Sequence, residues 1–73
     1  MPEVEKIAEE ADLIVNGYSF KVDKNNVKIL NLNNPVKALV VKNDFTILET
    51  TMDDIEIHIV KQYLERNKEF LEL

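Results

Sequence analysis

The sequence predicts an α+β domain in which a short N-terminal helix and a long C-terminal helix pack on an antiparallel sheet of about five strands, built from two hairpins. Two features support this prediction. Apolar residues recur with helical spacing at both ends of the chain, and between these ends they alternate with polar residues in short runs. The length of 73 residues leaves room for a single domain, residues 1–73.

The first helix is predicted over residues 2–11. Pro2 fits the first turn, where its missing N–H costs nothing. Because so short a helix is marginal by itself, its apolar face is expected to be buried. That face follows the i, i+3, i+4, i+7 spacing: Val4, Ile7, Ala8 and Ala11.

A β-hairpin is predicted around Asn16-Gly17. An Asn-Gly pair accommodates the positive φ angles of a type I′ turn, and Gly17 is the single glycine of the sequence. A two-residue loop pairs Val15 with Tyr18. This register places five apolar residues on one face: Leu13, Val15, Tyr18, Phe20 and Val22.

A third strand is expected after the polar run 23–26. Val27 would then pair with Val22, and Ile29 would pair with Phe20, which extends the same apolar face. The following run 31–35, Asn-Leu-Asn-Asn-Pro, breaks the alternation and predicts a bend. Its side-chain amides could hold an extended ligand, although asparagine-rich segments more often satisfy their own backbone.

Residues 36–42 and 45–49 are predicted to form a second hairpin around the turn Asn43-Asp44. Both faces of this hairpin are apolar, which is typical of strands covered on two sides, by helices or by a partner subunit. Ala38, Val40, Phe45 and Ile47 are expected on one face, and Leu39, Val41 and Leu48 on the other.

The last helix is predicted to begin within residues 51–54 and to run to Leu73. Thr51 or Asp53 can cap its N terminus. Its apolar residues cover roughly 200° of the helix, more than the ~100° of a surface helix, so part of this surface needs a further contact. The alternation across residues 55–59 also fits a sixth strand, but the Thr-x-x-Asp start and the continuing apolar pattern favour a helix.

The composition argues against an enzyme, a metal site or a bound cofactor. The sequence has no cysteine, one histidine, one arginine and one serine. His58 is expected to be exposed, because Asp54 is its only suitable partner four residues away. Glu56 falls within the apolar arc. A buried carboxylate there could act as an acid or a base, but proximity to the free amides of the first turns explains the residue more simply.

The charge is unevenly distributed along the chain. The net charge is −5, with acidic ends and five lysines between residues 13 and 50. These lysines lie near Tyr18 and Phe20, as on a nucleic-acid surface, but the absence of arginine there and the net negative charge disfavour nucleic-acid binding. The acidic ends could instead bind a basic partner.

The location of the protein is expected to be cytoplasmic. No segment approaches the ~20 consecutive apolar residues of a membrane span, so no membrane association is expected. The start of the chain is acidic, whereas a signal peptide begins with a basic region.

The small size of the domain predicts a partner. A single core in so short a chain rarely supplies more than ~3–5 kcal/mol of folding stability, and neither a disulfide nor a metal site is expected to increase it. We therefore predict a non-enzymatic protein-interaction module, either a homodimer or a domain that binds a heterologous protein. The expected contact residues are Ile57, Val60, Leu64 and Leu71 on the helix, or Leu39, Val41 and Leu48 on the second hairpin.

Two other functions remain as alternatives. The first is an antitoxin-like or regulatory protein that binds a basic partner through its acidic termini. The second is an enzyme that uses a buried carboxylate, with Glu56 as the candidate, or that uses His58.

The C-terminal strand and helix resemble those of a family of small uncharacterised bacterial domains. The similar spacing is that of Ile47-Leu48-Glu49, Met52, Ile59-Val60, Tyr63-Leu64-Glu65, Asn67-Lys68-Glu69 and Leu71. The Pro-His-Phe-His-type motif in the first half of that family is missing from this sequence. The resemblance implies an α+β domain of unknown function with a link to toxin–antitoxin or regulatory gene pairs, and no site residue carries over.

Overall fold

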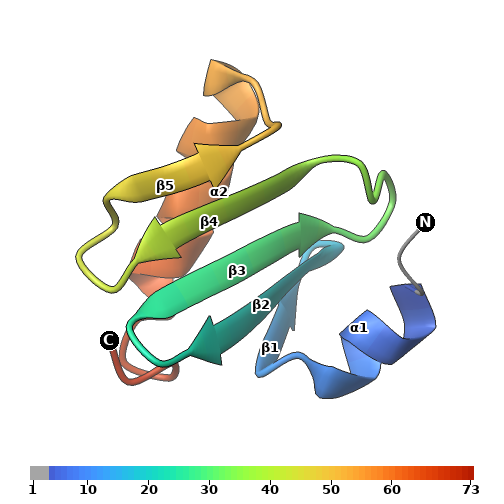
Figure 1. Cartoon of the computed structure of the whole chain (residues 1–73). Coiled ribbons are helices and arrows are strands. Elements are labelled where there is room, and N and C mark those ends of the chain that lie inside the picture. The colour runs from blue at the N-terminus through green and yellow to red at the C-terminus, as the bar shows by residue number, and fades with distance from the viewer. Residues whose placement is uncertain (1–3) are drawn as a thin grey trace.

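The computed structural model describes residues 4–73, with side chains from residue 6 onward, and confirms the predicted α+β architecture (Figure 1). The expectations for Pro2 and for the side chain of Val4 lie outside the described residues. The elements in chain order are α1 (Val4–Glu10), β1 (Leu13–Val15), β2 (Tyr18–Asp23), β3 (Asn26–Asn31), β4 (Ala38–Lys42), β5 (Ile47–Thr50) and α2 (Asp54–Arg66).

The five strands form one antiparallel meander in which each strand pairs with its neighbours in sequence, in the order β1-β2-β3-β4-β5. The predicted register is confirmed where Val15 pairs with Tyr18 and Val22 with Val27. Helix α2 crosses one face of the sheet, behind the strands in Figure 1. Helix α1 lies against the other face, which we call the outer face, where Ile7 lines a groove together with residues of β2, β3 and β4.

The core lies between α2 and the sheet, because the alternation of each strand directs its apolar side chains to that face. Ser19 is also buried, but it lies on the outer face, since its neighbour Phe20 points into the core. Residues 55–59, for which a strand was the alternative, are helical. The buried apolar residues are Phe20, Val27, Ile29, Leu39, Val41, Met52, Val60, Leu64 and Leu71.

The second hairpin differs from its prediction. Its strands are shorter than expected, and the turn is longer: Lys42 N donates to Thr46 O (2.8 Å), while Phe45 lies in the turn with φ at 72°. The register also shifts between Val40 and Val41. An irregularity of this kind places an extra residue in one strand and reverses the faces beyond it.

Because of this shift, the prediction of which side chains of β5 lie on each face of the sheet was wrong. Ile47 pairs with Val41 and so lies on the core side, not with Ala38 and Val40. Phe45 belongs to neither strand.

The last helix ends earlier than predicted, at Arg66. Asp53 caps its start, since Asp53 Oδ1 accepts a hydrogen bond from Glu56 N (2.8 Å). At the other end Asn67 Nδ2 donates to Tyr63 O (2.8 Å), so this side chain competes for a carbonyl of the last turn. The chain then turns back, which brings Leu71 into the core with 5% of its surface exposed.

No helix within residues 4–73 is long and apolar enough to cross a membrane.

The Asn16-Gly17 turn has the expected backbone, with φ of 48° and 82°. We expect Gly17→Ala to lower the free energy of unfolding by about 1–2 kcal/mol, because a Cβ is disfavoured at positive φ. An added Cβ would also lie 2.7 Å from Asn33 Nδ2, at the mobile end of an exposed side chain. Chemical denaturation measures the effect. Asn16→Gly is the control and should leave stability unchanged or raise it; equal losses in both variants would contradict a strained φ at Gly17.

Candidate functional site

A hydrogen-bonded cluster joins α2 to the sheet at Glu56. Glu56 Oε2 accepts one hydrogen bond from Tyr18 OH (2.7 Å) and another from Asn31 Nδ2 (2.9 Å). All three residues are half-buried. The sequence suggested that Glu56 lies close to the free amides of the first turn. In the structure the Glu56 N–H is one of these amides, and it donates to Asp53. Its carboxylate instead binds donors from β2 and β3.

Asn31 connects this cluster to the asparagine-rich loop. Asn31 Oδ1 accepts hydrogen bonds from Asn33 N (2.9 Å) and Asn34 N (3.1 Å), while its Nδ2 reaches Glu56. The prediction that asparagines here satisfy their own backbone is therefore confirmed for Asn31. One carboxamide fixes the shape of the loop and also fastens it to α2.

Tyr18 is held in its neutral form by this environment. Burial, followed by the hydrogen bond to Glu56 and the negative charge of that carboxylate, raises the pKa of Tyr18 to about 12. The ring of Tyr63 packs nearby, with 6.0 Å between ring centroids and 50° between ring planes. A hydroxyl with so high a pKa is a hydrogen-bond donor and a weak acid. The cluster therefore has the properties of a structural link.

His58 lies on the exposed side of α2, as predicted. Its Nε2 is 3.2 Å from Nε2 of Gln62. Among residues 4–73 no group of three or more histidine, cysteine, aspartate or glutamate side chains is placed to hold a metal ion.

The predicted contact residues are mostly inside the molecule. Ile57 is half-buried and Leu48 is 46% exposed, so these two remain within reach of a partner. The other five fill the core of the single chain, so they are not accessible to a partner. One face of the helix is enough to cover the sheet. The buried five are Val60, Leu64, Leu71, Leu39 and Val41.

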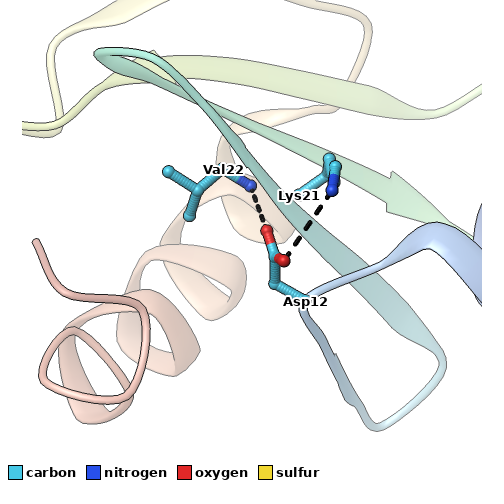
Figure 2. Close-up of polar contacts among 3 residues, drawn as sticks. All are labelled: Asp12, Lys21 and Val22. Atoms are coloured by element: carbon cyan, nitrogen blue, oxygen red, sulfur yellow. Dashed lines mark hydrogen bonds and ion pairs between the residues drawn. The ribbon is translucent and has the colours of Figure 1, made fainter.

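The edge of β2 carries a polar arrangement that the sequence did not reveal (Figure 2). Asp12 Oδ2 accepts a hydrogen bond from Val22 N (2.7 Å), and Asp12 Oδ1 lies 3.8 Å from Lys21 Nζ. Strand β1 is too short to reach this part of β2, so a side chain replaces the missing strand. A carboxylate directly before a strand is a weak signal, because it could equally face water.

An apolar groove on the outer face was also missed. It lies between α1 and the strands β2 to β4 and has a volume of about 310 Å³. The alternation of β2 placed Ser19 and Lys21 on this face. However, the position of α1 above them depends on tertiary packing, which periodicity does not report.

These observations define a small α+β domain with a five-stranded antiparallel meander, one helix on each face and a link between α2 and an asparagine-rich loop. Residues 1–71 match the model of a family described as a family of unknown function (DUF7723), and the chain belongs to that family. Comparisons with curated proteins and with solved structures find no significant match. The resemblance of residues 47–71 to small bacterial domains stays a prediction.

Proposed function

We propose that this chain is a non-enzymatic protein-interaction domain that forms a homodimer through the exposed side of α2. The carrying observation is an apolar stripe on that helix. Ile55 is 75% exposed and Ile59 is 38% exposed, and they are four residues apart, so they lie on the same side of the helix. This is the part of the wide apolar arc that the sheet does not cover.

The charges of α2 favour a second copy of the chain as the partner. The first turn is acidic, with Asp54 and Glu56, and the last turn carries Arg66. Two copies related by a two-fold axis near Ile59 would run antiparallel. Arg66 of each copy would then approach the acidic first turn of the other, and opposite helix dipoles would lie side by side.

The spacing along α2 supports the same arrangement. Residues 55, 59, 62 and 66 follow alternating steps of four, three and four, which is the spacing of a helix–helix seam. Gln62 and Arg66 are exposed, as are the two isoleucines. This surface can therefore be covered without opening the core.

The proposal of a non-enzymatic role has support from the Glu56 cluster. Glu56 Oε2 is engaged by two donors, and Tyr18 retains its proton at neutral pH because its pKa is about 12. Both groups stabilise the junction of α2 with the sheet. Binding of a basic partner through the acidic ends is a separate prediction, for which strong weakening by salt is the expected signature.

The oligomeric state tests the proposal directly. We expect light scattering from micromolar to millimolar protein to approach twice the chain mass of 8.5 kDa. Ile59→Glu should give the monomer mass, because a charge would be buried at the centre of the seam. The matched control is Ile14→Glu on β1, a residue that is 48% exposed and lies outside α2; this variant should remain dimeric.

Charge exchange sharpens the same test. Arg66→Asp should weaken the dimer, and adding Asp54→Arg should restore it, because the opposite charges then face one another in exchanged positions. A wild-type chain that stays at 8.5 kDa at millimolar concentration would contradict self-association. Loss of the dimer in Leu48→Glu but not in Ile59→Glu would move the interface from α2 to the second hairpin.

A further inference from the structure

The outer-face groove has the size and lining of a small-molecule site. Its volume of about 310 Å³ lies at the lower end of the roughly 300–1,000 Å³ range of ligand pockets. At about 30 Å³ for each water-sized atom, it holds about ten non-hydrogen atoms. Its walls are largely apolar and include Ile7 from α1, Leu30 from β3, and Ala38 and Val40 from β4. An aliphatic chain or a small ring fits this lining.

Ser19 supplies a polar group in this apolar wall. The residue is 2% exposed and lines the groove. Its hydroxyl makes no hydrogen bond with the described residues. Because Ser19 lines the groove, its hydroxyl is within reach of a group bound there. A hydroxyl placed in this way gains a hydrogen bond when a polar ligand group enters.

Two lysines at the same groove indicate the charge of that ligand group. Lys21 and Lys28 are directly opposite one another in the β2–β3 register, and both line the groove. Directly opposed like charges destabilise a sheet. An anion bound between the two ammonium groups would relieve this repulsion.

Each of these lysines also has an acidic partner, with which a bound anion would compete. Asp12 lies 3.8 Å from Lys21 Nζ, and Asp23 lies 3.6 Å from Lys28 Nζ. The two lysine side chains are 51% and 60% exposed, so each pair is weak. Glu10 of α1 also lines the groove, and its negative charge would repel an anion. Removing this charge therefore tests the sign of the ligand charge.

We propose that the groove binds a small amphipathic carboxylate of about ten non-hydrogen atoms. The apolar body lies along Leu30, Ala38 and Val40. The carboxylate lies between Lys21 and Lys28 and accepts a hydrogen bond from the hydroxyl of Ser19. Because the groove is on the face opposite α2, this proposal does not depend on the dimer.

The first experiment compares three eight-carbon probes that differ in their polar group: octanoate, octanol and octylammonium. Each is titrated into the full chain below its micelle concentration and followed through the backbone amide signals by NMR. We expect octanoate to bind at least about tenfold more tightly than octylammonium, with octanol between them. The shifted amides should include those of Ser19, Lys28 and Val40. Absence of octanoate binding at millimolar concentration, or equal binding of octylammonium, overturns the proposal.

Variants of the groove test each contact. Ala38→Leu should abolish octanoate binding, because the larger side chain fills the space. Ser19→Ala should weaken binding by about tenfold, the effect of a lost hydrogen bond to a charged group. Thermal unfolding shows whether each variant is folded. Full octanoate affinity in a folded Ala38→Leu chain would place the ligand elsewhere.

Charge variants test whether the bound ligand group is negatively charged. Lys28→Gln should weaken octanoate binding by about two- to fivefold, and Glu10→Gln should strengthen it. Lys68→Gln is the matched control, since this exposed lysine lies near the C terminus and does not line the groove. Tighter binding in Lys28→Gln, or weaker binding in Glu10→Gln, overturns the assignment of an anion.

Discussion

Leu64→Ala is expected to lower the free energy of unfolding by about 2–5 kcal/mol, the largest effect of any substitution considered for this chain. Leu64 has no exposed surface and packs between α2 and the sheet. Truncation removes apolar contacts and leaves a cavity that a close-packed core fills only in part. The core of a domain of this length supplies at most about 3–5 kcal/mol of folding stability, so most of the stability would be lost.

Urea denaturation followed by circular dichroism measures this loss. Ile55→Ala is the matched control on the same helix, because Ile55 is 75% exposed. Its effect on the chain at low concentration should stay within about 0.5 kcal/mol. A Leu64→Ala chain as stable as the Ile55→Ala chain would contradict the packing of α2 described above.

Glu56→Ala is expected to have the second-largest effect, about 1–3 kcal/mol, because it leaves two half-buried donors without their acceptor. Tyr18 OH and Asn31 Nδ2 both donate to Glu56 Oε2. The loss should be larger than for Glu65→Ala, a control on the exposed side of α2 where the carboxylate lies 3.5 Å from Lys68 Nζ.

The same variant has a spectroscopic signature at Tyr18. Removing the carboxylate removes its hydrogen bond and its charge, so the pKa of Tyr18 should fall from about 12 toward its ordinary value of 10.0. Absorbance of the phenolate, with Tyr63 as the second tyrosine, follows this titration. An unchanged pKa in a folded Glu56→Ala chain would show that burial alone raises it.

The raised pKa also fixes a pH dependence for the wild-type chain. The folded state holds the Tyr18 proton more tightly than the unfolded state does, so the stabilising effect is complete below about pH 10. It is lost as the pH rises from about 10 to about 12, the two pKa values of the unfolded and folded states. In Glu56→Ala this alkaline decline should begin and end within a narrower range.

Local patterns predicted the fold where each element follows its own periodicity. The Asn16-Gly17 turn set the register of the first two strands and the polar run 23–26 that of the third, so that Phe20 and Ile29 pair on the core face. The prediction for the second hairpin was wrong for two reasons. Its turn includes Phe45 at positive φ, which is uncommon for a bulky residue, and the strand pairing shifts by one residue. Neither feature has a local signature.

The candidate sites depended on contacts between distant parts of the chain. The sequence singled out Glu56 as a polar residue in an apolar arc, but its partners are 38 and 25 residues away in sequence. Ser19 alternates with Phe20 and so lies on the opposite face of the sheet, yet its burial depends on where α1 packs. Periodicity assigns a residue to a face, whereas only the tertiary arrangement determines what covers that face.

Asp12 has a consequence for how the sheet meets other chains in a crowded solution. An open strand edge offers unpaired N–H groups on which further strands can be added, and this is a route to fibrous aggregates. At β2 the Asp12 carboxylate already occupies the N–H of Val22, and Lys21 lies beside it. At the opposite edge, the irregular pairing of β5 interrupts the straight ladder that an added strand would need. These two parts of the sheet edge are thus poorly suited to strand addition, and contacts with other molecules there fall to side chains instead.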